Sequence, residues 1–584
     1  MLEEKIDKCF KLPIFFSENC NPVPDNIINE LELITTKNNN DPSSNLAKPQ
    51  QKTIYNDLLN IKTEFDNVIL KQLISNYTTD INFLKDTQKI ISDLSSSNIK
   101  SDESVFNAWE SFKNIKEDAG FIDRYQYVNW DQLKFLNTSV LFLTIYSFYS
   151  IISPALNVAA PLFILLIPFF VLKMKKIPIT ISGYVKILIT SIKNNTLGRL
   201  VTQWNTIPTG QKIYMMVMMG MYVYNIYQNF LSCYRFYKNT STINKNIHNI
   251  KHFLNNTAHK IKNFISLSNK YSAYKKYNKY LQENLKEIQL LHNSLEKIPI
   301  AGMGPKNISC LGYTLKQYFI IYDSYDIENI MLFCFGFNGY LDKITGICKS
   351  IKDKKIRKAT FKKSDTAILK FKKLYNPTIK SEKIVKNTFN INKNKLITGP
   401  NASGKTTLLK TTIINTILSQ QMGFGYYKSA VITPFDHFHC YINIPDTSSR
   451  DSLFQAEARR CLDIINTINK SQNQKHFCIF DELFSGTNPY EAISSAQSYL
   501  EYLSEFKGTR LLLTTHFIEL CMKFKKHKKF SNINMETIII NNNAQYKYKI
   551  KKGISTAKGG ISVLKQLDYP DKIVKNTINN LKDM

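Results

Sequence analysis

The sequence predicts an α/β domain at the C-terminal end, preceded by an all-α region that contains a transmembrane helical hairpin. Beyond about residue 365, short apolar strands alternate with helices and are separated by Gly, Pro and Asn, which is typical of an α/β domain. One of these strands runs into a glycine-rich loop at 399–407, and an apolar helix follows it. Residues 135–172 carry no charge, and uncharged runs of this length are typical of membrane helices.

Length and charge limit the class of protein. At roughly 100–200 residues per domain, 584 residues allow about three to five domains. Hydrophobic residues at 43% and charged residues at 21% exclude a disordered, collagen-like or disulfide-stapled chain. A net charge of +31 favours an anionic partner such as nucleic acid or a phospholipid surface. The alternative is an AT-rich genome, because the chain is rich in Lys, Asn, Ile and Tyr throughout.

The cysteines and histidines give weaker signals. Ten cysteines lie far apart without a C-x-x-C pair, so we expect neither a zinc site nor a disulfide framework, and a reducing compartment fits best. His437 and His439 would point to one face of a strand, but no third metal ligand is in view. The N-terminus begins with acidic residues and lacks an apolar segment, which is not typical of a signal peptide.

Composition divides the chain into five parts. Residues 1–50 look irregular, and apolar residues at three- and four-residue spacing predict helices over 51–134. The remaining parts are a membrane-associated segment at 135–235, a basic helical region at 236–364 and the α/β domain at 365–584.

The uncharged run at 135–172 is too long for one membrane crossing. Its 38 residues would form a helix of roughly 57 Å, against a hydrocarbon core of about 30 Å. Pro154 and Pro161 break the run near its middle, which favours a hairpin of two short membrane helices. A buried helical pair inside a soluble domain is the alternative. A second uncharged run at 213–234 either spans the membrane, lies on it or packs internally.

The glycine-rich loop carries the clearest chemistry. It matches G-x-x-x-x-G-K-[ST] in full and reads Gly399, Pro400, Asn401, Ala402, Ser403, Gly404, Lys405, Thr406 and Thr407. Such a loop lets successive N–H groups surround the phosphates of ATP, while the following helix directs its positive end at them. Lys405 neutralises phosphate charge, and the Thr406 hydroxyl is suited to bind Mg²⁺.

Two further strands end in polar residues. Phe477 to Phe480 reads as a buried parallel strand that delivers Asp481 to the Mg²⁺ ion and Glu482 to the attacking water. An acidic pair that merely caps a core strand is the alternative. A strand at 511–515 ends in His516, which is placed to sense or stabilise the γ-phosphate.

These motifs resemble one known family. The run ITGPNASGKTTLL, then FDELFSGTNPYEA, then LLTTHFIEL is similar to the ATPase domain of the MutS family of DNA mismatch-repair proteins, a branch of the ABC-type ATPases. The resemblance covers about 365–580 and implies an ABC-type P-loop ATPase that depends on Mg²⁺ and has no small-molecule substrate beyond ATP. Tyr375 stands in a segment similar to the one that lies near the adenine in the family, although Asn376 replaces its His. The helices at 51–130 and 236–360 resemble the family's core and lever only loosely.

The resemblance also implies a homodimer. Ser452 to Glu457 keeps the Ser, Phe and Glu of the family's S-T-F-M-V-E-M loop. In ABC-type ATPases this Ser lies at a helix N-terminus and completes the ATP site of the opposite subunit, so Ser452 would act in trans at two composite sites. Capping of its own helix is the alternative reading, and both can hold. Residues 548–550 and 553–563 look like the family's closing strand and K-S-[YF]-G-I segment, with Gly559 in place of the aromatic residue.

Departures from the family leave the biological role open. Phe16-Ser17-Glu18 is the only F-x-E near the N-terminus and lies too early for a mismatch-reading domain, which we expect to be missing. The first hypothesis is a MutS-like ATPase dimer acting on DNA; the second is a membrane-anchored ATPase in signalling or transport-associated work that does not bind DNA. A degenerate ATP-binding scaffold is a third. We expect a membrane-associated protein with its ATPase domain in a reducing compartment, or a soluble cytoplasmic or nuclear one if the hairpin is buried.

Overall fold

The structure is a computed structural model, and it describes residues 2–34, 53–59, 63–96, 103–175, 180–194, 199, 204–205, 208–299, 309–379, 381–442, 452–540, 543–555, 557, 561, 564, 567 and 569–580. The chain forms two compact units, each described below by itself. The first comprises Met1–Ser101, Lys260–Asn284 and Leu332–Met584, and the second comprises Asp102–His259 and Leu285–Met331.

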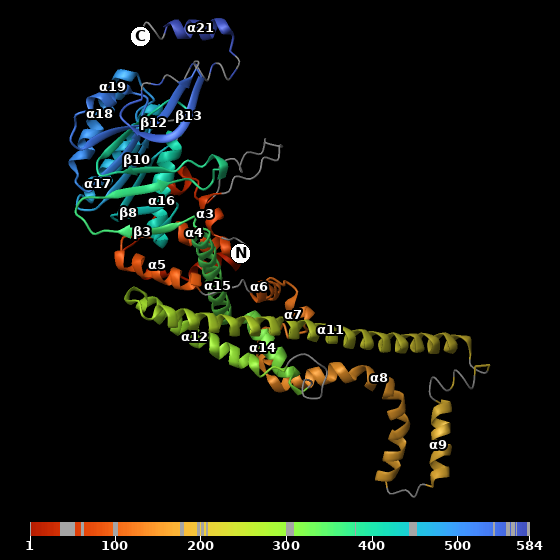
Figure 1. The fold of residues 1–584 in the computed structure, drawn as a ribbon. Coiled ribbons are helices and arrows are strands. Elements are labelled where there is room, and N and C mark those ends of the chain that lie inside the picture. The colour runs from red at the N-terminus through yellow and green to blue at the C-terminus, as the bar shows by residue number, and fades with distance from the viewer. Residues whose placement is uncertain are drawn as a thin grey trace. The chain divides into compact units, whose positions relative to one another are not determined.

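A six-stranded sheet forms the centre of the first unit (Figure 1). Its order is β13-β12-β6-β11-β10-β9, and all neighbours run parallel except β13, which pairs antiparallel with β12. The strands β6, β10 and β11 are buried almost throughout, because helices cover the sheet on both faces. The bounds are β6 Asn394–Thr398, β9 His437–Tyr441, β10 His476–Asp481, β11 Thr509–Thr514, β12 Phe530–Ile540 and β13 Asn543–Lys552.

Three helices pack on one face of this sheet. They contribute Ile464, Leu500 and Leu520 to a hydrophobic core that the sheet completes with Phe480 and Leu513. On a further helix, α16, nearly all side chains are buried, polar ones included, because β10 and β11, the N-terminal segment and a second sheet surround it. The bounds are α16 Lys405–Met422, α17 Leu453–Lys470, α18 Pro489–Glu505 and α19 Ile518–Lys523. The expected α/β domain is therefore present.

The second sheet has five strands in the order β5-β4-β8-β3-β7. It begins at Arg357, slightly before the boundary that composition predicts. Its strands are β3 Arg357–Phe361, β4 Leu369–Leu374, β5 Asn387–Asn390, β7 Phe424–Gly425 and β8 Ser429–Ile432, with the 3₁₀ turn η5 Ser381–Lys383 between β4 and β5.

The N-terminal segment is ordered from its start, so the expectation of irregular structure over 1–50 is wrong for residues 2–30. Its elements are α1 Leu2–Cys9, η1 Pro13–Phe16, β1 Cys20–Pro22 and α2 Asp25–Glu30. Ile6, Phe10 and Ile27 are fully buried, so tertiary packing overrides a composition that is typical of a loop. Phe16 packs its ring against Tyr277 and Tyr280 at 5.4 and 5.2 Å. The Asn-rich stretch 36–50 lies outside the described residues.

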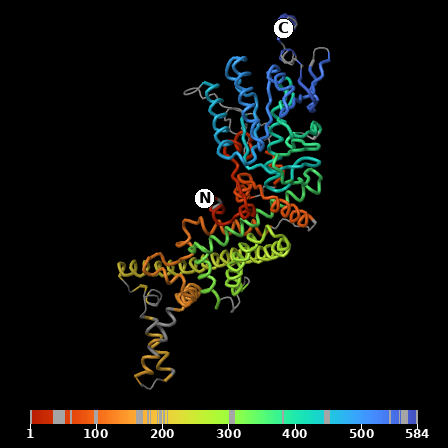
Figure 2. Tube along the Cα trace, turned by 90° about the vertical axis from the view of Figure 1, so that its left-hand side faces the viewer, coloured from red at the N-terminus to blue at the C-terminus, as the bar shows by residue number. Residues whose placement is uncertain are grey.

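The next elements join this segment to the α/β domain. They are α3 Ile54–Leu58, α4 Glu64–Ile74, β2 Asn76–Thr78 and α5 Ile81–Ser96. The Tyr55 hydroxyl donates a 2.6 Å hydrogen bond to Gln421 Oε1, and Gln421 Nε2 donates to the carbonyl of Ile74 at 2.9 Å. Figure 2 traces this red N-terminal segment beside the C-terminal domain.

The second unit is helical, as predicted for most of 51–364. Its elements are α6 Glu103–Lys116, α7 Phe121–Arg124, η3 Asp131–Thr138, α8 Val140–Met174, α9 Ile181–Asn194 and α14 Leu311–Asp323. Parts of three helices shared with the first unit complete it: α11 Thr209–Ser268, α12 Lys275–Glu296 and α15 Tyr325–Lys352. The short elements η4 Ser272–Tyr274 and α21 Asp571–Asn580 belong to the first unit.

The uncharged run 135–172 does not form the predicted hairpin. Residues 135–138 belong to η3, and Val140–Met174 is one helix that continues through Pro154 and Pro161 and bends along its length (Figure 1). Proline removes one backbone hydrogen bond and kinks a helix without necessarily ending it. Within the described residues, one stretch, Val140–Ala159 of α8, is long and apolar enough to cross a membrane. The second run, 213–234, lies within the 60-residue helix α11.

Candidate functional site

The glycine-rich loop connects β6 to α16, as the sequence predicts. Gly404 precedes the helix with φ +92°, a conformation that side-chain-bearing residues rarely adopt, and a Cβ there would lie 3.1 Å from Cδ1 of Tyr548. A Cβ on Gly399 would lie 2.8 Å from Ser403 Oγ. Both glycines are therefore required by close approach as well as by backbone conformation. The loop directs the positive end of α16 at the space above it.

Lys405 lies buried at the first position of α16. Its ammonium group donates to the carbonyl oxygens of Gly399 at 3.0 Å and Pro400 at 3.3 Å. Burial lowers the pKa of Lys405, while the nearby charges of Glu482 and Asp481 act in the opposite direction. The ammonium group therefore lies inside the loop in which it is predicted to neutralise phosphate charge.

Asp481 receives hydrogen bonds from two neighbouring elements at the carboxyl end of β10. The Thr406 hydroxyl donates to Oδ2 at 2.7 Å, and the Thr514 hydroxyl donates to Oδ1. The parallel order of β10, β11 and β6 brings these ends to the same edge of the sheet. Hydroxyl and carboxylate oxygens are the ligands that Mg²⁺ prefers, so this pair of residues fits that ion.

Glu482 and His516 meet beside the loop. His516 Nε2 lies 2.9 Å from Glu482 Oε1 and 3.1 Å from Lys405 Nζ. The hydrogen bond from His516 lowers the pKa of Glu482 most, burial opposes this, and the charges of His516 and Lys405 lower it further. One imidazole nitrogen carries either a hydrogen or a lone pair, so Nε2 can bond Glu482 or Lys405 but not both at once.

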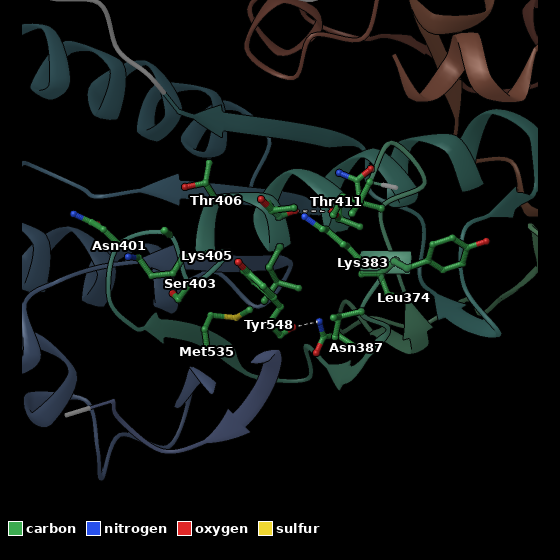
Figure 3. Close-up of a pocket in the computed structure, with 18 of the residues that line it drawn as sticks. Leu374, Lys383, Asn387, Asn401, Ser403, Lys405, Thr406, Thr411, Met535 and Tyr548 are labelled. Atoms are coloured by element: carbon green, nitrogen blue, oxygen red, sulfur yellow. Dashed lines mark hydrogen bonds between the residues drawn. The ribbon is translucent and has the colours of Figure 1, made fainter. Parts of the chain in front are cut away.

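A pocket of about 450 Å³ opens above the loop. Figure 3 shows Asn401 and Ser403 on one side of it and Lys383 and Asn387 on the other. The Ser403 side chain is buried, and its Oγ has no hydrogen-bond partner among the described residues. A buried hydroxyl without a partner at a ring of backbone N–H groups fits a phosphate group as the missing partner.

Two tyrosines line this pocket. Tyr375 is the residue predicted to lie near the adenine. Lys386 Nζ lies 4.9 Å from the centre of its ring, and its hydroxyl donates a hydrogen bond to the carbonyl of Lys355. Tyr548 on β13 lies next to Gly404, with the Asn387 amide donating to its carbonyl at 3.0 Å (Figure 3). The sequence showed only that Tyr548 is an aromatic residue in the segment similar to the closing strand. The pairing of β12 with β13 is what places it over the loop.

Ser452 and Glu457 lie at the start of α17 with distinct contacts. Ser452 caps the helix: its hydroxyl accepts from the Gln455 N–H at 3.3 Å, and Gln455 Oε1 accepts from the Ser452 N–H at 3.0 Å. Glu457 is buried and accepts from the N–H and hydroxyl of Ser485 and from the Gly486 N–H at 3.0–3.1 Å. Glu457 therefore positions the loop that follows Glu482, a role that sequence reasoning missed.

A row of three histidines lies across β9 and β10. His437 and His439 share one face, as predicted, and His476 joins them: its ring centre is 4.8 Å from that of His437, and its Nδ1 is 3.0 Å from His439 Nε2. Within the described parts of the chain, no group of three His, Cys, Asp or Glu residues is arranged to hold a metal ion. All ten cysteines are free thiols, as the absence of C-x-x-C suggests.

The fold and the site define an α/β domain with a glycine-rich loop at the carboxyl edge of a mainly parallel sheet. Residues 395–584 match the family model of MutS domain V, so this part of the chain is similar to that domain. The DNA mismatch repair protein MutS of Bacteroides fragilis (strain YCH46) is 33% identical over 192 residues, which are 32% of this chain and 22% of that protein.

Other bacterial MutS proteins give similar matches. Identity to MutS of Aquifex pyrophilus is 30% over 190 residues, and identity to MutS of Bacillus subtilis (strain 168) is 29% over 190 residues. Each match covers 32% of this chain and 22% of the relative's length. The likeness is therefore one of the C-terminal domain, and it carries the fold of that domain.

Proposed function

We propose that the chain binds and hydrolyses ATP at the loop between β6 and α16. One observation carries this proposal: residues of three separate sequence motifs meet at the loop. Thr406 bonds Asp481, and His516 lies within hydrogen-bond distance of both Lys405 and Glu482. The MutS domain V match over 395–584 supports the same conclusion.

Each residue has a distinct role in this reaction. Lys405 and the backbone N–H groups of 399–404 bind the phosphates, and Ser403 completes its hydrogen bonding there. Thr406 and Asp481 hold Mg²⁺, which supplies charge neutralisation at the phosphates when bound. Glu482 is the general base that removes a proton from the attacking water, and its lowered pKa keeps it ionised for that role at neutral pH.

His516 links the base to the phosphate-binding lysine. When Lys405 turns from His516 toward a phosphate, Nε2–H of His516 is free to donate to Glu482 or to the γ-phosphate. Tyr548 and Tyr375 both line the pocket and offer aromatic faces for the adenine.

We further propose that the chain works as a homodimer on DNA and associates with a membrane. The MutS relatives are named as DNA mismatch repair proteins, and a net charge of +31 suits a polyanionic partner. The exposed N-terminus of α17 leaves Ser452 accessible to the ATP site of a second subunit.

A membrane-anchored ATPase that does not bind DNA is the second candidate. The observation that favours it is the largely exposed apolar helix α8, which a soluble DNA-binding protein does not need. Steady-state hydrolysis measured with and without duplex DNA, matched and mismatched, separates the two. DNA stimulation that weakens steeply with salt supports the first candidate, and indifference to DNA supports the second.

The direct test of the enzymatic proposal is Glu482→Gln. Loss of the base should lower kcat roughly 100- to 10,000-fold while ATP affinity stays within a few-fold, so that an ATP-bound dimer accumulates. Phosphate release and equilibrium nucleotide binding measure the two effects. The control is Glu501→Gln, an exposed position on α18 that should leave both unchanged. Unchanged hydrolysis in Glu482→Gln would contradict the assignment of the base.

A further inference from the structure

Three helical segments of the second unit expose apolar side chains on an unusual scale. They are α8, α9 and residues 209–237 of α11, together called the apolar arm below. Ordinary surface helices bury one apolar stripe and expose polar residues on the opposite side. The arm exposes large apolar residues on several sides, with 40–85% of the side chain accessible, among them Leu141, Ile145, Tyr149, Leu156, Val158, Val185, Ile213, Met221, Val223, Tyr227 and Phe230.

Internal contacts leave this outer surface uncovered. The helices α8 and α11 lie against each other, with the Tyr222 hydroxyl donating to the carbonyl of Asn157 at 3.0 Å and Cys233 Sγ reaching the carbonyl of Ile151 at 3.9 Å. These bonds use the facing sides. Leu156 and Val158 flank the first contact and remain 47% and 58% exposed. Patches larger than a few hundred Å² normally mark an interaction site.

The dimensions of the arm suit a lipid bilayer. The candidate span Val140–Ala159 has 20 residues, or about 30 Å of helix, which equals the thickness of a hydrocarbon core. Only 17% of that stretch is buried within the protein, whereas the core helix of a soluble protein is mostly buried. Every arm segment is helical, so its backbone groups are hydrogen-bonded within the helix, as hydrocarbon requires, except at the prolines of α8; the Asn157 carbonyl, four residues before Pro161, accepts from Tyr222 instead.

The charge of the arm is of one sign. The sequence has no Asp or Glu between Asp131 and Glu283, so the whole arm lacks carboxylates. Apart from Lys186 in the middle of α9, the cations named here lie near helix ends. Lys173 and Lys175 lie at the end of α8, and Lys212 lies at the start of α11 beside Trp204, with 5.0 Å from Nζ to the ring centre. Tryptophan and lysine side chains at the ends of apolar helices are typical of the zone of lipid headgroups.

This charge also argues against a second copy of the chain as the occupant. Two arms packed face to face would bring like charges together with no carboxylate to neutralise them. Anionic headgroups supply that neutralisation while the hydrocarbon covers the apolar side chains.

We propose that the apolar arm inserts into a lipid bilayer that carries anionic headgroups, with Lys173, Lys175 and Lys212 at the headgroups. The inference rests on the membrane association proposed above and specifies the elements and the lipid class. It replaces the hairpin expected at 135–172 with α8, α9 and the N-terminal part of α11.

Vesicle flotation of the purified full chain tests it. Vesicles of phosphatidylcholine alone are compared with vesicles that also contain phosphatidylglycerol. We expect several-fold more protein to float with the anionic vesicles than with the neutral ones. The bound protein should stay bound in 1 M salt, which screens charge interactions beyond about 3 Å, because the inserted apolar side chains hold it. The double variant Leu156→Asp/Val158→Asp should float at least tenfold less. The control Leu290→Asp/Met522→Asp changes two equally exposed apolar residues outside the arm and should float normally.

A second variant keeps the proposal testable if the aspartates disturb folding. Lys173→Glu/Lys175→Glu leaves the apolar surface intact and should abolish the preference for anionic vesicles.

Flotation of the Leu156→Asp/Val158→Asp variant at the unsubstituted level would overturn the role of the arm while leaving membrane association standing. Equal flotation with both lipids would overturn the lipid class. A loss of self-association without a loss of flotation would identify a second copy as the occupant and overturn the proposal. ATP hydrolysis is measured without vesicles, so either result leaves the enzymatic proposal separately testable.

Discussion

His476 shows how a single buried residue makes stability depend on pH. Its Nε2 lies 3.1 Å from the carbonyl of Ser471, which only accepts, so Nε2 carries the hydrogen and Nδ1 accepts from His439 Nε2 at 3.0 Å. A second proton on Nδ1 would face the N–H of His439. Burial lowers the pKa of His476 to about 4, and burial together with the neighbouring histidines and Arg460 lowers the pKa of His439 well below its usual range.

We expect stability to fall as the pH drops from about 6.5 to 4. Above pH 6.5 His476 is neutral in both the folded and the unfolded protein. Between about pH 6.5 and 4 it becomes protonated in the unfolded protein but stays neutral in the folded protein, so protonation favours unfolding. The pKa of His476 is about 6.5 in the unfolded protein and about 4 in the folded protein, and this difference lowers the free energy of unfolding by about 3 kcal/mol at pH 4. Urea unfolding at pH 7.5, 6 and 5 measures the effect, and His476→Leu should flatten the dependence. If the unsubstituted protein and the His476→Leu variant lost stability equally with falling pH, the row of histidines would not be the cause of the pH dependence.

Tyr548 is the residue that sequence reasoning named without giving it a role. Its ring borders the pocket next to Gly404, so Tyr548→Ala should raise the Kd for ATP about fivefold, from the loss of roughly 1 kcal/mol of aromatic stacking. Tyr548→Phe keeps the ring and should bind normally. Tyr325→Ala, an exposed tyrosine of the second unit, serves as the control. Equal affinities for the Ala and Phe variants would place the adenine elsewhere.

At the scale of elements, α16 joins the nucleotide site to the N-terminal segment. The loop lies at its first residue, and its last turn bonds α3, α4 and β2 through Gln420 and Gln421. A rise of 1.5 Å per residue makes this helix roughly 27 Å long. This helix therefore connects the loop directly to residues 53–78.

Gln421→Leu should destabilise the protein by about 1–3 kcal/mol, because it leaves the Ile74 carbonyl and the Tyr55 hydroxyl buried without partners. The midpoint and slope of urea unfolding provide the measure. Gln497→Leu is the matched control, because the amide of Gln497 bonds Glu501 on the exposed surface of α18. A stability equal to that of the control would mean that the N-terminal segment is not held through α16.

At the scale of the whole molecule, composite ATP sites make a distinctive prediction. Ser452→Asp keeps an efficient helix cap but places a negative charge against the phosphates of the opposite subunit. Both Ser452→Asp and Lys405→Ala should lose activity alone. A mixture of the two should recover about a quarter of the unsubstituted activity, because half of the dimers are mixed and each has one intact site. An absence of recovery, with subunit exchange verified, would contradict action in trans.

Much of the C-terminal domain follows from sequence alone, because its strands are apolar on both faces and its loop has a specific pattern. Residues 395–398, 477–480 and 511–514 are strands as predicted, and the glycine-rich loop stands where the motif puts it. By contrast, the order of residues 2–30 and the continuation of α8 through Pro154, Pro161 and Pro168 were not predictable. Both depend on contacts with distant segments that composition does not reveal.

The sequence by itself determined the chemistry of the site, because the residue types and spacing of a phosphate-binding loop are local properties of the chain. The tertiary structure alone decided which residues meet. It placed His516 Nε2 within hydrogen-bond distance of Glu482 and of Lys405, placed Tyr548 next to Gly404 of the loop, and bonded Glu457 to the segment after Glu482. It also showed that the stretch Val140–Ala159 of α8 is largely exposed. These contacts join residues far apart in the chain, so strand order and packing settle them rather than any local pattern.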